Sequence, residues 1–433
     1  MMRPHAILRG GITRATRTLR GEEVSASKAQ TNARAMMCLT RRWASSNPSN
    51  TPPKGGVPKE MLVHEGKAIL KLMIGGVLLA TGFIASSGFV IEKMKEINPM
   101  PAPGRFLELH DDAGNPVKVH YRLRGNGDVT VIFDGGVGET SFDWDKVAEQ
   151  VAEFATVLSI DRPGLGFSTP GSLPRTASQV AKEYADILEM VNVPRNVVLV
   201  GHGAGGYNMR QLAKDLTQHA TGSNVKCQGL VLVDALQENL RAELESVSEP
   251  VRAALQKMDA NGDTVLRLAH VGIIRLITTV QRKKMMDKYS AEALPYVEFY
   301  TPTPAHRRGA NNENAALPLT EERFRESPPV RGLDVPTVVL THGKADLFEG
   351  MIMQPGITPP AVAALEDKWQ EAQRVLAKTV SSKPALQIIV KDGGHCIHHE
   401  KPEEVTKVVR ALVNETRGDG AGLESLTTAT CPV

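Results

Sequence analysis

The most informative pattern in this 433-residue chain is a turn that lacks the residue type its chemistry requires. The segment 196–202 reads as a short apolar strand, and Gly201-His202-Gly203-Ala204-Gly205 overlaps its end. This spacing matches the G-x-S-x-G turn between a strand and a helix, on which a serine hydroxyl is presented as a nucleophile. Gly203 occupies the serine position, so the turn has the pattern of a nucleophile site without the nucleophile.

Strand and helix patterns alternate along most of the chain after residue 105. Short runs rich in Val, Ile and Leu predict buried strands, and apolar residues spaced three and four apart predict helices. A hairpin is expected at 106–123, followed by strands at 129–136, 156–164, 196–202, 229–236, 336–343 and 386–394. This alternation predicts an α/β fold, with a mostly parallel, doubly wound sheet covered by helices on both faces. Ligands of such sheets bind beyond the carboxyl ends of the strands.

One long segment, 237–333, interrupts the alternation. Its apolar residues mostly recur at the spacing of a helix, and none of its stretches alternates as a strand does. The segment is also too long for a loop in a compact domain. We therefore predict a helical cap inserted over the active edge of the sheet. The cap divides the core into 105–236 and 334–415, and a flexible tail is expected at 416–433.

Five motifs within residues 105–415 resemble the α/β-hydrolase superfamily, in the haloperoxidase-like and epoxide-hydrolase-like branch with a helical cap. They are FDGGVGETSFDW (133–144), DRPGLGFS (161–168), VGHGAGG (200–206), THGKAD (341–346) and GGHCIHHEKPEEV (393–405). Each motif alone is weak evidence for the family. All five together are specific, because they occur in this order and each lies at an expected strand end. The resemblance implies an α/β-hydrolase fold.

The resemblance also implies roles for particular residues. His395 lies just past the last predicted strand, at the position of the family's general base. Asp346 follows the strand before it, at the position of the carboxylate that orients the base. The backbone N–H groups of Val137 and Ala204 would form the oxyanion hole.

The hydroxyl missing at Gly203 leaves two functions open. Ser141 and Ser168 lie in loops at the same edge, but neither is on the turn, and a misplacement of about 1 Å can cost roughly a hundredfold in rate. The first function is an enzyme for small apolar, ester-like substrates, in which His395 and Asp346 act as a general base without a covalent step. The alternative is a catalytically dead accessory or scaffold subunit of a mitochondrial membrane complex.

The N-terminal region carries the basic surplus of the chain. Residues 1–43 contain nine Lys and Arg against two acidic residues, which leaves 42 basic and 46 acidic residues for the remainder. The body therefore lacks the positive surplus of a nucleic-acid-binding protein. An arginine-rich segment almost without acids predicts a mitochondrial transit peptide at 1–45.

A membrane anchor is predicted after a polar linker at 46–71. Residues 72–91 include no charge, and a helix of that length rises about 30 Å, which matches a bilayer core. A Pro-rich spacer follows at 92–104. We therefore predict a single-pass protein of the inner mitochondrial membrane. Gly82 and Ser86 form a small-residue face against which a partner helix could pack.

No cofactor or metal is expected from the sequence. It contains no nucleotide-binding loop and no metal-ligand cluster, and its four cysteines form no C-x-x-C pair. His398 and His399 are adjacent, so on a helix their side chains would diverge. The expected partners are a small apolar substrate and the membrane.

Overall fold

The computed structural model of the chain describes residues 59–218, 224–326, 333–382, 385–419 and 422–427. The predicted transit peptide at 1–45 and the first part of the predicted linker lie outside these residues.

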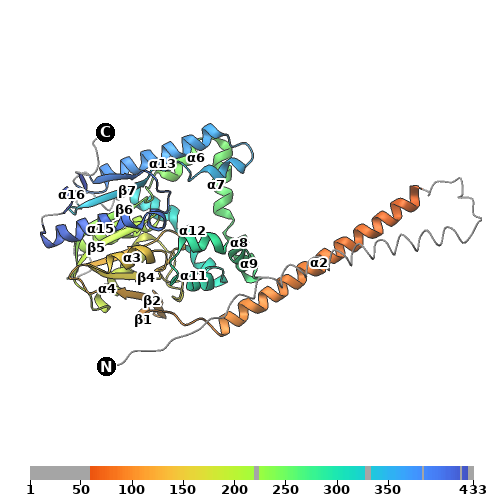
Figure 1. Cartoon of the computed structure of the whole chain (residues 1–433), viewed down its shortest axis with the longest axis horizontal. Helices are drawn as coiled ribbons and strands as arrows, with labels where there is room; N and C mark the ends of the chain where they lie inside the picture. Colours follow the sequence, from red (N-terminus) through yellow and green to blue (C-terminus); the bar gives the residue numbers. More distant parts are fainter. Residues whose placement is uncertain (1–58, 219–223, 327–332, 383–384, 420–421, 428–433) are drawn as a thin grey trace, which may run out of the picture. The chain divides into compact units, whose positions relative to one another are not determined.

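An eight-stranded sheet forms the core, in the order β1-β2-β4-β3-β5-β6-β7-β8 (Figure 1). The strands are β1 (Arg105–His110), β2 (Pro116–Arg124), β3 (Thr130–Asp134), β4 (Thr156–Ile160), β5 (Asn196–His202), β6 (Lys226–Val233), β7 (Thr337–His342) and β8 (Leu386–Val390). β1 and β2 form the antiparallel hairpin, β2 runs antiparallel to β4, and the remaining pairs are parallel. The predicted α/β fold with its mostly parallel sheet is confirmed.

Helices cover both faces because side chains alternate along each strand. In β5, Val197 and Leu199 pack on one helical layer, whereas Val198 and Val200 pack on the other. The first layer consists of α4 (Ala177–Met190), α5 (Gly205–Thr217) and α13 (Pro359–Thr379). The second consists of α3 (Asp145–Val151), α15 (Pro402–Arg417) and the short α16 (Glu424–Thr427). Two apolar cores therefore hold the strands rigidly and fix the loops at their carboxyl ends.

The described residues between β6 and β7 form a series of helices joined by short turns, with no strand among them. It contains α6 (Leu240–Glu245), α7 (Glu249–Ala260), α8 (Gly262–His270), α9 (Ile273–Val280), α10 (Arg282–Lys288), α11 (Leu294–Tyr300) and α12 (Pro304–Glu326). Leu240, Leu244 and Val251 pack against α13 and the short η1 (Glu349–Met353). This contact joins the inserted helices to the sheet domain beside the ends of β6 and β7.

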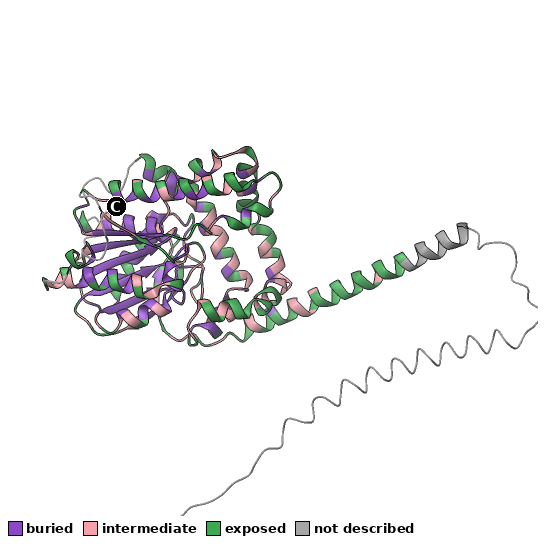
Figure 2. Cartoon of the chain, turned by 45° about the horizontal axis from the view of Figure 1, so that its top comes forward, coloured by how far each residue is buried: buried purple, intermediate pink, exposed green. Residues whose placement is uncertain are grey.

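Helix α2 (Lys59–Ile97) is longer than the sequence predicts. It begins within the expected linker and continues into the expected spacer, and it ends before Pro99 because proline disfavours helix both at its own position and at the residue before it. Its apolar side chains face outward, with Leu72, Leu79 and Phe83 each at least 75% exposed (Figure 2). Among the described helices, this is the one candidate that is long and apolar enough to cross a membrane, by length and composition.

Candidate active site

The glycine turn between β5 and α5 has the backbone conformation that a nucleophile site requires. Gly203 has φ +53°, in the left-handed region, and its carbonyl accepts hydrogen bonds from the N–H groups of Gly206 and Leu236. A Cβ at Gly203 would lie 3.5 Å from the Cα of Gly136, which is ordinary van der Waals contact. A Cβ at Gly205 would lie only 2.5 Å from the carbonyl oxygen of Asp134. The turn therefore needs its flanking glycine but has room for a side chain at the position of the missing serine.

His395 forms the predicted histidine–carboxylate pair, but with a different partner. It lies between β8 and the short α14 (Ile397–Glu400), and its Nδ1 is 2.6 Å from Oδ2 of Asp234. Asp234 directly follows β6 and has φ +45°, the one positive φ of a non-glycine residue in the described chain. Such a conformation costs about 1–3 kcal/mol and persists where the surroundings impose it. Here it turns the carboxylate towards the ends of β7 and β8.

The predicted pairing of His395 with Asp346 does not occur in the structure. Asp346 lies in the loop after β7 with its side chain 39% exposed, and its carboxylate contacts Lys344 at 3.5 Å. β7 continues to His342, so the residue that it directs into the site is a histidine, and Asp346 follows four residues later on the surface. The carboxylate comes from the neighbouring strand instead.

Asp234 is the centre of a hydrogen-bond network. Its Oδ1 accepts from Nε1 of Trp369 at 3.0 Å, and its Oδ2 lies 2.6 Å from Nδ1 of His342. Nε2 of His342 in turn contacts Glu366 closely. Burial opposes ionisation, yet the hydrogen bonds from His342 and His395 hold the pKa of Asp234 well below its usual range. Burial likewise opposes a charge on His342, but hydrogen bonds to the two carboxylates raise its pKa to about 10. Asp234 is thus an anion shared by two imidazoles.

The two predicted oxyanion residues lie together. Val137 and Ala204 both line a small cavity of about 20 Å³, which is room for about one water molecule. Neighbouring N–H groups of the same loop are already occupied, because Gly136 donates to Oε2 of Glu139 at 2.7 Å and Gly138 donates to Oε2 of Glu313 at 3.0 Å. Within the described chain, no acceptor contacts the N–H groups of Val137 or Ala204.

Comparison with known proteins identifies the family that the five sequence motifs resemble. The family model described as "Alpha/beta hydrolase family" matches residues 131–408. The chain belongs to this family. Of the solved structures, the Cif epoxide hydrolase from Acinetobacter nosocomialis matches with a TM-score of 0.50 and 16% identity, over 76% of this chain and 96% of that one. The epoxide hydrolase CorEH matches with a TM-score of 0.49 and 18% identity, over 72% and 99%.

Similarity to curated sequences is local. A stretch of 102 residues is 33% identical to the dihydrolipoyllysine-residue acetyltransferase component of the acetoin cleaving system from Cupriavidus necator, covering 24% of this chain and 27% of that protein. A stretch of 82 residues is 29% identical to the uncharacterized protein YqjL of Bacillus subtilis, covering 19% and 32%. The chain therefore spans about a third or less of the length of these relatives.

A second polar cluster of this α/β-hydrolase adjoins the first, with the ring centroids of His202 and His395 4.7 Å apart. Nδ1 of His202 is 2.9 Å from Oε2 of Glu139, and Nε2 of His202 donates to the carbonyl of His395 at 3.2 Å. Burial disfavours the charged form of His202, but Glu139 raises its pKa above the usual value. His398 is fully buried, and neither ring nitrogen has a hydrogen-bond partner among the described residues.

The same cluster resembles a cation site only in part, because both ring nitrogens of His202 already make hydrogen bonds. Glu139, His202 and His398 each offer one ligand atom, and these atoms lie within 4.8 Å of one another. This grouping was not predictable from the sequence, because the three residues belong to three separate motifs. Burial lowers the pKa of His398 well below the usual value, so this imidazole is neutral and able to act as a ligand.

A larger cavity of about 150 Å³ approaches the histidine–carboxylate pair through Trp369, although neither His395 nor Asp234 lines it. The ring of Trp369 lines it and meets the ring of His395 edge-on, with centroids 5.2 Å apart. Tyr207 lines both this cavity and the smaller one, and its buried hydroxyl has no hydrogen-bond partner in the described part of the chain. Sequence reasoning missed Trp369 and Tyr207, because neither belongs to a catalytic motif.

Neither Ser168, Ser141 nor Cys396 replaces the missing serine. Ser168 is a structural residue, since its hydroxyl donates to the carbonyl of Asp161 at 2.6 Å and accepts from the N–H of His120. Ser141 is buried and its N–H donates to the carboxylate of Asp161, with no contact to His395 among the described residues. Burial raises the pKa of the Cys396 thiol to about 12, so it remains a thiol rather than a nucleophilic thiolate.

Proposed function

We propose that this protein is a membrane-anchored α/β-hydrolase-fold enzyme in which His395 acts as a general base, with no covalent step at Gly203. The observation that carries the proposal is the geometry of His395. Its Nδ1 is held by Asp234, while the described chain provides no partner for Nε2, and the side chain is 26% exposed. An anionic carboxylate at Nδ1 fixes the proton there, so that Nε2 is the free base.

The chemistry follows from this tautomer. Nε2 of His395 removes a proton from a water molecule as the water oxygen attacks the carbonyl carbon of an ester. The N–H groups of Val137 and Ala204 stabilise the oxyanion. Collapse of the tetrahedral intermediate breaks the bond to the leaving alcohol, which receives the proton from His395. Because a serine nucleophile normally supplies much of the rate in such a unit, turnover will be slow relative to serine members.

The substrate class is proposed from the cavity beside Trp369. Apart from Tyr207 and Trp369, five apolar side chains contribute to its wall: Leu236, Leu240, Leu244, Leu255 and Met258. Its wall also carries the polar side chains of Gln237, Arg241, Asp259 and Glu321, of which Arg241 pairs with both acids. A cavity of about 150 Å³ accommodates a molecule about as large as benzene. The hydroxyl of Tyr207 is available to donate a hydrogen bond to the substrate. A small, apolar, ester-like substrate fits these properties.

The location is proposed from the N-terminal region. A long helix with exposed apolar side chains is unfavourable in water and stable in a bilayer, which supports a single membrane span by α2. The arginine-rich segment 1–45 supports import into mitochondria and placement in the inner membrane.

A specific observation also favours the alternative, a catalytically dead accessory subunit. Glu139 and Glu313 occupy two N–H groups of the oxyanion loop with negative charges that the protein itself supplies. Glu313 comes from α12 of the cap and also binds Arg162, which secures the loop. In this case Gly82, which has open space around it in the structure, would seat a helix of the partner complex.

Ester hydrolysis by the full chain in detergent micelles tests the proposal. Wild type, Gly203→Ser, His395→Ala and the double variant are compared on p-nitrophenyl acetate and butyrate. Turnover by wild type that His395→Ala abolishes supports the general-base enzyme. The proposal is contradicted if wild type hydrolyses neither ester while Gly203→Ser does so and loses this activity in the double variant. That result would identify an inactive enzyme that lacks only the serine nucleophile. Co-purification of a stoichiometric membrane partner would then support the accessory subunit.

A further inference from the structure

The C-terminal part of α2 is closely packed on the cap. A Cβ at Gly88 would lie only 2.1 Å from the carbonyl oxygen of Val271, so the two backbones touch. Glu92 is only 6% exposed, and both its oxygens accept hydrogen bonds from Arg275, at 2.5 and 2.8 Å. Arg275 also donates to the carbonyl of Phe299. Backbone contact and a bidentate ion pair therefore fix residues 88–92 against α9 and α11.

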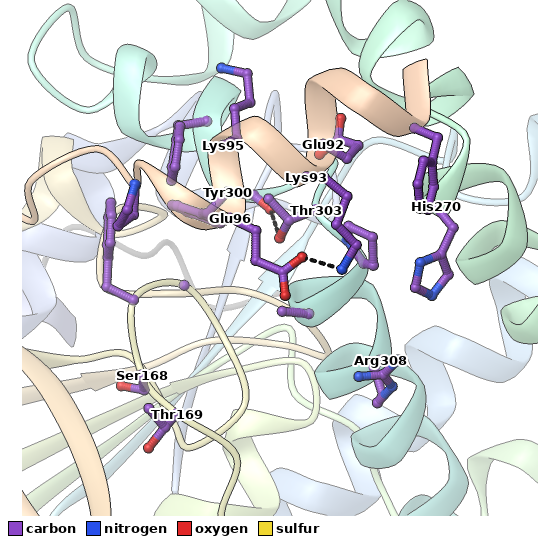
Figure 3. Close-up of a pocket in the computed structure, with 17 residues that line it drawn as sticks. Glu92, Lys93, Lys95, Glu96, Ser168, Thr169, His270, Tyr300, Thr303 and Arg308 are labelled. Carbon is purple, nitrogen blue, oxygen red and sulfur yellow. Dashed lines mark hydrogen bonds and ion pairs between the residues drawn. The ribbon is translucent and has the colours of Figure 1, made fainter. Parts of the chain in front are cut away.

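A partly open pocket of about 630 Å³ lies beside this contact, within the size range of small-molecule sites. Figure 3 shows residues 92–96 of α2 on one side and residues of the cap, among them His270 and Arg308, on the other. Aromatic rings form much of its apolar wall: Phe89, Phe167, Phe299 and Tyr300. None of the residues of the candidate active site lines it.

The charges of the pocket leave a positive surplus. Glu92 is neutralised by Arg275, which lies outside the pocket. Lys93 pairs with Glu96 at 2.6 Å, but both side chains are more than half exposed, and such pairs contribute only about 0–1 kcal/mol. Arg308 is exposed and makes no hydrogen bond or ion pair with any described residue. Lys95 lies over the ring of Phe299, near the Glu92 carboxylate that Arg275 already neutralises.

We propose that this pocket binds an anionic amphiphile with a single long apolar chain. The chain lies against Phe89, Phe167 and Phe299, and Arg308 binds the anionic head group. Lys93 is recruited from its exposed pair with Glu96 when the anion arrives. A fatty-acid carboxylate and a lysophospholipid phosphate share this chemistry, since arginine pairs with either group through two parallel hydrogen bonds.

The position of the pocket suits a ligand that comes from a membrane. Lys93 and Lys95 directly follow the apolar part of α2, where basic residues flank a membrane span. An amphiphile in the adjacent leaflet would therefore enter with its head group at the level of these lysines. Entry from the bilayer rests on the proposed anchoring, whereas binding in the pocket does not depend on His395 or on catalysis.

Photolabelling of the full chain in phosphatidylcholine nanodiscs tests the site. The probe is a palmitic acid analogue with a diazirine in its chain, and labelled peptides are identified by mass spectrometry. We expect saturable labelling of peptides that contain residues 89–99 or 299–308. Excess oleate or oleoyl lysophosphatidate should compete, whereas oleic acid methyl ester should not. Competition by oleate alone identifies a carboxylate site, and competition by lysophosphatidate alone identifies a phosphate site.

Two pairs of variants separate binding from general damage. Ala305 lines the pocket and is exposed, so Ala305→Trp should fill the space and abolish labelling, while Ala363→Trp on the surface of α13 should not. Arg308→Gln should weaken competition by the anions about tenfold, and Arg374→Gln should not. All four variants should unfold at the temperature of the wild type. Unsaturable labelling, labelling elsewhere, equal competition by the methyl ester, or equal labelling of Ala305→Trp and Ala363→Trp would overturn the proposal.

Discussion

Two adjoining clusters of histidines and carboxylates lie at the glycine turn, and they differ in whether an imidazole nitrogen is left free. Around Asp234, His395 has one nitrogen held and the other free on a partly exposed ring. Around Glu139, both nitrogens of His202 are occupied, and His398 is completely buried. Under the proposed mechanism, a histidine–carboxylate contact alone does not make a catalytic base. The imidazole must also present a free nitrogen to a space that a substrate can enter.

The largest effect is expected from Asp234→Asn. It removes an anion that two imidazoles share inside the protein, and breaking a buried ion pair costs about 3–5 kcal/mol. Urea unfolding of the full chain in micelles should show a loss of this size, and any His395-dependent ester hydrolysis should disappear. Asp346→Asn is the matched control, because an exposed carboxylate contributes less than about 1 kcal/mol. Equal losses in the two variants would show that the carboxylate of the site has been misassigned.

The pH dependence of stability should report the protonated state of His342 in the Asp234 cluster. The folded-state pKa of His342, about 10, exceeds the unfolded value of about 6.5, so folding favours its protonated form. Its contribution is complete below about pH 6.5 and is lost as the pH rises towards 10. The free energy of unfolding should therefore fall by a few kcal/mol across this window.

The variant His342→Gln isolates this contribution. It should be less stable at neutral pH, and its stability should change much less between pH 6.5 and 10. Asp234 has a depressed pKa, so its own contribution is lost at the opposite end, as the pH falls below about 4. A wild-type profile that stays flat up to pH 10 would argue against a protonated His342.

A smaller effect is expected from Glu139→Gln in the second cluster. The amide retains the shape of the side chain and can still accept from the N–H of Gly136, but the negative charge that stabilises protonated His202 is lost. We expect a loss of about 1–3 kcal/mol in unfolding free energy and, for any ester hydrolysis, a smaller loss than in Asp234→Asn. Glu153→Gln, at an exposed glutamate, is the control for the change of charge. If Glu139→Gln abolished turnover completely, the second cluster would be catalytic rather than structural.

The smallest effect is expected from Cys396→Ser. The thiol adjoins His395 in sequence, but its pKa of about 12 keeps it protonated at neutral pH. We expect unchanged turnover and a change in stability within about 1 kcal/mol. The same pKa predicts that iodoacetamide modifies Cys396 at least roughly a hundredfold more slowly than free cysteine at pH 7.5. Rapid loss of activity on alkylation of this one thiol would require a direct role.

Much of the sheet and its covering helices was predictable from the sequence, because these elements depend on patterns of neighbouring residues. Apolar runs such as 196–202 form buried strands because both of their faces are covered, and this pattern is visible without a structure. The turn at Gly203 was recognisable because its glycines are required at fixed positions beside one strand. The extent of α2 was underestimated, because polar residues on either side of an apolar stretch can continue a helix until a proline ends it.

The sequence by itself determined the parallel sheet, the glycine turn and the position of His395, because each depends on periodicity or on residues adjacent along the chain. Only the tertiary structure decided which carboxylate meets His395. Asp234 and Asp346 both follow apolar strands, and the choice between them depends on the left-handed backbone at Asp234 and on the convergence of β6, β7 and β8. The cluster of Glu139, His202 and His398 likewise brings three distant motifs together. Contacts across strands are set by packing, which no single stretch of sequence contains.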